Sequence, residues 1–169
     1  MASKTINFSS FLLLLLSLSA LSQLHATQES KNGIRKISTC LSDKGYNSMA
    51  LILHMTLPSL IPSDSVFNTT TFTIFSPTDK AFLSSKYPQP PLTLLRYHVT
   101  PSTFNKTLPH GSKIDTLLRG HPLMATSSHR KASINGVKIV EWDVYNDGKV
   151  IVHGVEEFFD PAFQTLRYP

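Results

Sequence analysis

The stretch TFTIFSPTDKAF, residues 71–82, changes its pattern half-way along. Threonine, isoleucine and phenylalanine fill its first half, which favours a strand. Pro77 ends that strand, because proline has no N–H to donate to a central ladder. Thr78 or Asp79 can then accept backbone N–H bonds at the start of a short helix. We therefore expect a strand-to-helix corner here. The side chains expected to anchor its strand in the core are Phe72, Ile74 and Phe75.

A catalytic serine is the alternative interpretation of the same corner, because Ser76 and Asp79 both lie in it. However, no G-x-S-x-G surrounds Ser76, and the residue that follows it is proline. A nucleophile also needs a base within hydrogen-bond reach, which the sequence does not place. The chain contains no H-E-x-x-H or C-x-x-C and no glycine-rich phosphate loop. We expect no enzyme activity, no metal site and no cofactor, with a secreted hydrolase as the alternative.

The first 26 residues have the pattern of a secretory signal peptide. Lys4 supplies a positive charge, residues 11–21 form a short apolar stretch, and Ala26 offers a small residue for cleavage. The apolar stretch is too short to span a bilayer comfortably. The C-terminal residues contain no small-residue site followed by an apolar tail, so we expect no glycolipid anchor. We expect a secreted, extracellular protein without a stable membrane anchor.

The charge of the chain is mildly basic. The formal net charge is +5, and it falls to +4 when Lys4 is removed with the signal peptide. This balance fits acidic polymers outside the cell, such as polyuronates, as partners. The one basic cluster, HRK at 129–131, has no interleaved aromatic residues. We therefore expect no binding to nucleic acid.

Three further positions bear on processing outside the cell. Cys40 is the single cysteine, so an internal disulfide is impossible. It is either a small buried side chain near a helical stripe or a free thiol that can pair with another molecule. Asn68 and Asn105 begin N-x-T sequons and are expected to carry N-glycans.

The remaining pattern predicts an α+β chain with helices first and a mostly antiparallel sheet afterwards. Residues 33–57 read as two helices separated at Gly45, with Asn47 able to cap the second. Asn135-Gly136 and Asp147-Gly148 each lie between β-type segments and predict two-residue hairpin turns. The apolar stripe of the first helix consists of Ile34, Ile37 and Leu41.

Within this architecture the expected boundaries are a polar, loose lead-in at 27–32, a single domain at 33–161 and a short tail at 162–169. Tyr97 and His98 are expected at the extended end of LTLLRYHV. Neighbouring strand residues point to opposite faces, so we expect one of them in the core and the other accessible. His153 lies in a β-branched run and is expected to be a structural histidine on a half-buried face.

Three stretches in this order resemble the motifs of fasciclin domains. TFTIFSPTDKAF resembles the first motif, and LLRYHVTP, with Tyr97 and His98, resembles the central Tyr-His motif. INGVKIVEWDVYNDGKVIVHGVEEFFDP, residues 134–161, resembles the second long motif. The motif positions that it supplies are Asp143, Gly148, His153 and Pro161.

The resemblance implies a β-sandwich wedge with N-terminal and flanking helices, and a role in adhesion or matrix interaction without catalysis. It also implies Tyr97 and His98 as candidates for cell-surface binding. The chain is similar to short, secreted plant fasciclin-like arabinogalactan proteins, although it lacks their clustered Ala-Pro, Ser-Pro or Thr-Pro region. The implied partners are a polysaccharide of the plant cell wall or a cell-surface or matrix glycoprotein. The alternatives are a hydrolase at Ser76 and a self-associating structural glycoprotein linked through Cys40, and the oligomeric state is left open.

Overall fold

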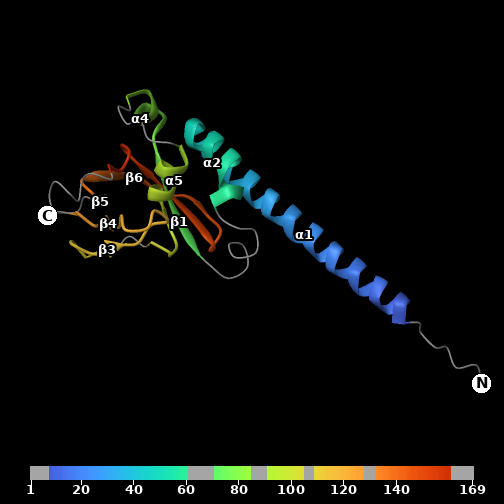
Figure 1. Ribbon diagram of the computed structural model, residues 1–169. Helices are drawn as coiled ribbons and strands as arrows, with labels where there is room; N and C mark the ends of the chain where they lie inside the picture. The colour runs from blue at the N-terminus through green and yellow to red at the C-terminus, as the bar shows by residue number, and fades with distance from the viewer. Residues whose placement is uncertain (1–7, 61–70, 85–90, 105–108, 128–131, 161–169) are drawn as a thin grey trace, which may run out of the picture.

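The protein folds into helices packed on a curled sheet, with one long helix that extends outward (Figure 1). The computed structural model describes residues 8–60, 71–84, 91–104, 109–127 and 132–160. The elements in chain order are α1 (Phe8–Asp43), α2 (Asn47–Leu60), β1 (Phe72–Pro77), α4 (Asp79–Ser84), α5 (Pro91–His98), β2 (Val99–Thr100), β3 (Lys113–Ile114), β4 (Leu123–Met124), β5 (Ser133–Ile134), β6 (Val137–Asn146) and β7 (Val150–Val155).

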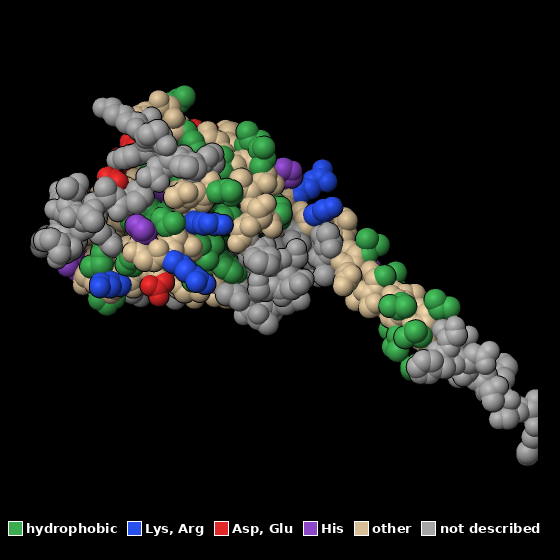
Figure 2. All heavy atoms as spheres, in the orientation of Figure 1, with side chains coloured by type: hydrophobic (Ala, Val, Ile, Leu, Met, Phe, Trp, Pro, Cys, Tyr) green, Lys and Arg blue, Asp and Glu red, His purple; other side chains and the backbone are tan. Residues whose placement is uncertain are grey.

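Helix α1 has two parts with different surroundings. Its apolar side chains over residues 11–24 are exposed, and this part projects away from the rest of the protein (Figures 1 and 2). The expected stripe of Ile34, Ile37 and Leu41 is buried, which confirms it. The helix also runs through residues 27–32, so the prediction of a loose segment there is wrong. No proline or glycine lies between Phe8 and that segment, so nothing interrupts the helical hydrogen bonds. Over the described residues, no helix is both long enough and apolar enough to cross a membrane.

The break between α1 and α2 falls where the sequence predicts it. Gly45 adopts a φ of +84°, a conformation that glycine reaches without strain. The Tyr46 N–H then donates to the Leu41 carbonyl at 2.9 Å, which closes the end of α1. The N-terminus of α2 is capped by Asp79 from a distant part of the chain, although the sequence suggests Asn47 for this role.

The main sheet has five strands in the order β2-β1-β7-β6-β5. The neighbours β1 and β7 are parallel, and the other pairs are antiparallel. A two-stranded ladder, β3-β4, joins the edge through a bridge between Ala125 and Ile134. This mixed arrangement of helices and sheet confirms the α+β class. The meander β5-β6-β7 confirms the expected C-terminal hairpins.

The two hairpin turns differ in detail from one another. Asn135 and Gly136 have φ values of 49° and 79°, the combination of a type I′ turn, as the Asn-Gly pair predicts. In the second hairpin the Asp147 N–H donates to the Val150 carbonyl at 3.2 Å. The tip is therefore Gly148-Lys149, one residue later than the expected Asp147-Gly148, and Gly148 has a φ of +84°.

Both faces of the central strands β1 and β7 are buried. On one face α1 and α2 cover β1 and β7, and Leu53, Ile74 and Val152 belong to this core. The other face forms a second core with the β3-β4 side of the protein, in which Phe75 and Val155 take part. Neighbouring residues of β1 thus enter different cores, as the alternation of a strand requires. Phe72, Ile74 and Phe75 are buried as expected.

Candidate functional site

Tyr97 and His98 occupy the last turn of α5, and both side chains are buried, with 0% and 1% of their surface exposed. The prediction that one of them is accessible is wrong. That prediction assumed an extended backbone, in which neighbours alternate, whereas the helix continues through His98. Because both rings are buried in this structure, neither can contact a partner outside the chain.

His98 joins α5 to the segment that follows β7. Its Nε2 accepts the Phe159 N–H at 3.0 Å, so Nδ1 carries the proton and donates to the Leu94 carbonyl at 2.8 Å. The imidazole stacks on the Phe159 ring, with 4.7 Å between centroids. Burial lowers the pKa of His98 to about 4, although the bond to Leu94 acts in the opposite direction. The ring is therefore neutral at physiological pH.

The Tyr97 hydroxyl is hydrogen-bonded to Asn135, a residue that the sequence predicts only as part of a turn. The Asn135 Nδ2 donates to the Tyr97 hydroxyl at 2.7 Å, and the Asn135 Oδ1 accepts the Met124 N–H at 2.7 Å. Burial raises the pKa of Tyr97 to about 12. Asn135 therefore links the type I′ turn to α5 and β4. The Asn-Gly signal predicts the turn, but nothing in the sequence indicates the partner.

The Pro77-Thr78-Asp79 corner connects α4, α2 and the segment that follows β7. The Thr78 Oγ1 accepts the Ala81 N–H at 3.3 Å at the start of α4 and donates to the Glu156 carbonyl at 3.1 Å. Asp79 caps a different helix, α2, which precedes the corner in the chain. The corner is thus a structural junction, as expected, although only Thr78 caps the helix that follows it.

The Asp79 carboxylate binds the N-terminus of α2 with both oxygens. Oδ2 accepts the Asn47 N–H at 3.1 Å and its Nδ2 at 3.0 Å, and Oδ1 accepts the Ser48 N–H at 2.8 Å. Burial acts to raise the pKa of this carboxyl, but the hydrogen bonds from Ser48 and Asn47 outweigh it and lower the pKa below its usual value. The negative charge also faces the positive end of the helix dipole.

His153 holds a bulge of β6 against a distant loop. Its Nδ1 accepts the Asp143 N–H at 3.1 Å, so Nε2 donates to the Phe104 carbonyl at 3.1 Å. Asp143 has a φ of 52° and lies where the β6-β7 register shifts. The Trp142 ring meets His153 edge-on at 4.7 Å. Both ring nitrogens of His153 thus serve the fold. Pro161, the last motif position, lies outside the described residues.

Ser76 does not present a nucleophile in this structure. Its side chain is 0% exposed, and its hydroxyl has no hydrogen-bond partner among the described residues. The two buried histidines, His98 and His153, use both nitrogens for backbone contacts. Within the described part of the chain, no three His, Cys, Asp or Glu side chains gather in a way that could hold a metal ion.

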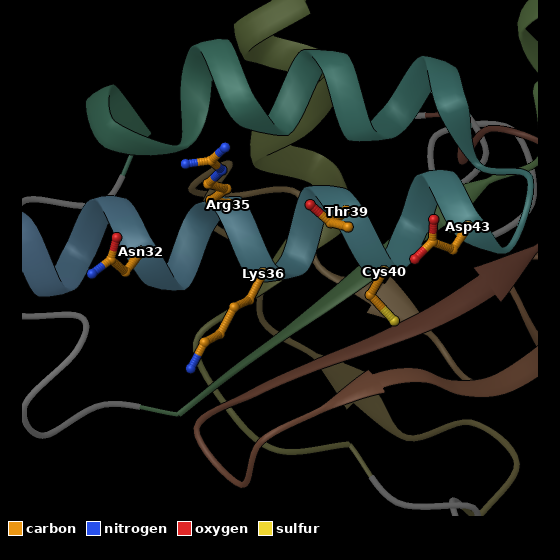
Figure 3. Close-up of a pocket in the computed structure, with 6 residues that line it drawn as sticks. All are labelled: Asn32, Arg35, Lys36, Thr39, Cys40 and Asp43. Atoms are coloured by element: carbon orange, nitrogen blue, oxygen red, sulfur yellow. The ribbon is translucent and has the colours of Figure 1, made fainter.

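Cys40 is a free, partly buried thiol whose Sγ donates to the Val144 carbonyl at 3.2 Å. It lines a hollow of ≈ 560 Å³ beside α1, together with two cations, Arg35 and Lys36 (Figure 3). The sequence predicts the thiol but not this hollow. Asn68 and Asn105, the two sequon residues, lie outside the described residues, so their glycosylation stays a prediction.

Residues 56–161 match the family described as Fasciclin domain. The chain belongs to the fasciclin domain family. Over 126 residues it is 37% identical to the putative fasciclin-like arabinogalactan protein 20 of Arabidopsis thaliana, a match that covers 70% of this chain and 28% of the relative. This fasciclin chain therefore spans about a quarter of the length of that relative. Both matches agree with the resemblance read from the three motifs.

Among solved structures, the chain resembles the FAS1 domain pair of the insect cell adhesion molecule fasciclin I. It aligns with a TM-score of 0.46 and 16% identity, over 74% of this chain and 44% of that one. In the fasciclin domain described here, the motif side chains of Tyr97, His98 and His153 are buried, and those of Thr78 and Asp79 are partly buried. Thr78, Asp79, Tyr97, His98 and His153 all hydrogen-bond to other parts of the same chain.

Proposed function

We propose that the protein is a non-enzymatic, extracellular adhesion or matrix-interaction module of the plant cell wall, which binds a polysaccharide or a glycoprotein partner. The observation that carries this proposal is the fasciclin match over residues 56–161, since the fasciclin domain is a cell-adhesion type of module. The burial of the motif side chains agrees with it, because Ser76, Tyr97 and His98 serve packing rather than chemistry. Recognition on this view belongs to exposed side chains.

Secretion is part of the proposal. The apolar residues 11–24 make no use of the domain core, as expected of a signal peptide that is removed after Ala26. The name of the Arabidopsis relative, a fasciclin-like arabinogalactan protein, supports a location in the apoplast or wall. N-glycans at Asn68 and Asn105 would follow from passage through the secretory pathway.

A self-associating structural glycoprotein is the second candidate, and one observation favours it. Cys40 is free and lines an open hollow at the surface. If two chains pair there, non-reducing gels of the secreted protein show a dimer band that Cys40→Ser removes. A monomer under both conditions contradicts this version.

The proposal is tested with the full chain secreted from plant cells and purified from the medium. Binding is measured against immobilised polysaccharides and against extracellular protein fractions, at low and high salt. We expect saturable binding to at least one of these materials. No binding to any of them contradicts the proposal. Covalent labelling by a broad serine-hydrolase probe that Ser76→Ala abolishes would instead favour the hydrolase.

A further inference from the structure

The domain part of α1 borders two hollows of the surface. The first, of ≈ 560 Å³, is lined by residues of α1, among them Asn32, Lys36 and Cys40 at intervals of four residues. In Figure 3 the side chains of Lys36 and Cys40 point from α1 toward the strands. The side chain of Arg35 points the other way, toward α2 (Figure 3).

The second hollow, of ≈ 600 Å³, lies on the other flank of α1, toward α2. Lys31 and Gln28 line it from α1, and His54 lines it from α2. Asn32 and Arg35 belong to both hollows, so the two form one continuous surface around the helix. Figure 2 shows Lys or Arg side chains beside a histidine where α1 meets α2.

Positive charge dominates this surface. Lys31, Arg35 and Lys36 are exposed, and Asp43 is the one acid among the described residues that line the two hollows. Among the described side chains, Lys44 and Glu141 form the one ion pair within 4.0 Å. The three cations therefore have no carboxylate partner among these side chains. We call Lys31, Arg35 and Lys36 the α1 cationic surface.

The spacing suits an extended chain with repeated negative charges. A helix rises about 1.5 Å per residue, so Lys31 and Lys36 are roughly 8 Å apart along the axis, with Arg35 one turn after Lys31. Asn32, between the two lysines, and Gln28, one turn before Asn32, offer amide groups that can bond to hydroxyls. Arginine can also hold a carboxylate with two parallel bonds.

The same lining disfavours other kinds of partner. Among the described lining residues His54 is the one aromatic side chain, so they offer no stacking platform of the kind that single-stranded nucleic acids use. The apolar side chains among the described residues of the second hollow, Ile34 and Pro58, are too few for an amphipathic helix to dock by its apolar face. Carboxylates combined with hydroxyls are the chemistry that remains.

We propose that the α1 cationic surface binds a carboxylated polysaccharide, a polyuronate chain that lies along the exposed side of α1. This inference rests on the proposed function and assigns its binding site and ligand class. Contacts of this kind form between exposed charges, so binding weakens as salt shortens the Debye length from about 30 Å at 0.01 M to about 8 Å at 0.15 M.

The test uses the full chain purified after secretion, with polygalacturonate as the acidic probe and an unbranched neutral glucan of similar length. We expect binding to polygalacturonate at low salt, with a loss of roughly tenfold or more at 0.3 M salt, and weak binding to the glucan. The double variant Arg35→Glu with Lys36→Glu is expected to bind polygalacturonate at least about tenfold more weakly. Replacing both residues with Gln gives an intermediate loss.

The matched control reverses two cations elsewhere, Arg96→Glu with Arg119→Glu. Both are exposed, and the Leu118 N–H donates to the Arg96 carbonyl, so they form a second basic region with the same change in net charge. We expect this control to bind within about twofold of the parent. All variants are first compared by thermal unfolding, since surface exchanges between Arg, Lys, Gln and Glu preserve helix propensity.

Two results overturn the inference while the proposed function survives. One is an equal loss in both double variants, which means that net charge alone drives binding. The other is binding to a protein or to the neutral glucan that the α1 variants leave unchanged. Absence of binding by the parent to every extracellular material overturns the proposed function and the inference together.

Discussion

Replacing Asp79 with Ala should destabilise the domain without touching any exposed recognition surface. The substitution removes the carboxylate that accepts the backbone N–H groups of Asn47 and Ser48 at 3.1 and 2.8 Å. Loss of an N-cap costs about 0.5–2 kcal/mol, and loss of the charge at the helix dipole costs about 0.3–1 kcal/mol more. We therefore expect Asp79→Ala to lower the free energy of unfolding by about 2 kcal/mol and Asp79→Asn, which keeps one oxygen, by about half of that.

The assay is urea unfolding of the secreted protein at pH 7, followed by circular dichroism. For a domain of this size, 1 kcal/mol corresponds to roughly 3–5 °C in Tm, so a thermal scan gives a second measurement. Asp115→Ala serves as the matched control, because Asp115 is exposed. A loss below about 0.5 kcal/mol for Asp79→Ala would refute the capping argument. So would an equal loss for Asp115→Ala.

The pH dependence of the stability of the same variants tests whether the negative charge of Asp79 is responsible. The pKa of Asp79 is lower in the folded state than its ordinary value of about 3.9. The carboxylate therefore adds stability above pH 4, and this contribution is lost as the pH falls through the folded pKa. The parent and Asp79→Asn should converge in stability at acid pH. A difference that stays constant down to pH 2 would show that the charge is not responsible.

Three further predictions concern buried contacts. Gly154→Ala places a Cβ 2.8 Å from Tyr46 Cζ, so we expect a loss of about 1–3 kcal/mol in urea unfolding, and a neutral result contradicts this packing. His98 has a folded pKa of about 4, below its ordinary 6.5, so stability should fall as the pH drops from 6.5 to 4. His98→Gln should flatten that slope, and an unchanged slope assigns the titration to another group. Asn135→Gly keeps the positive φ but removes the bonds to Tyr97 and Met124, so a loss of about 1–3 kcal/mol measures these two bonds apart from the turn, and no loss disproves their importance.

Local features of the fold could be predicted from the sequence, because each depends on a few neighbouring residues. The type I′ turn at Asn135-Gly136 follows from the φ values that these residues tolerate. The end of α1 at Gly45 and the strand that stops at Pro77 follow in the same way. The three motifs also led to the correct family, since their order and spacing span most of the chain.

Contacts between distant segments could not be predicted. The partners of Asp79 lie 31 and 32 residues earlier, and the partner of Tyr97 lies 38 residues later. A side chain that can cap a helix is visible in the sequence, but the helix that it caps depends on tertiary packing. The prediction that either Tyr97 or His98 is accessible was wrong for a related reason. Two further helical residues, Tyr97 and His98, change which neighbours face the core.

The buried position of His98 allows direct contact to be separated from structural support. Loss of the bond between its Nε2 and the Phe159 N–H costs about 1–3 kcal/mol. A domain that starts with 5–15 kcal/mol then remains more than about nine-tenths folded at 25 °C. His98→Gln should therefore leave the affinity for an extracellular partner unchanged, while Tm falls. If the affinity drops tenfold although the protein is folded, the closed region opens to the partner. Binding would then have to be reassigned from the exposed surface to the Tyr97-His98 pair.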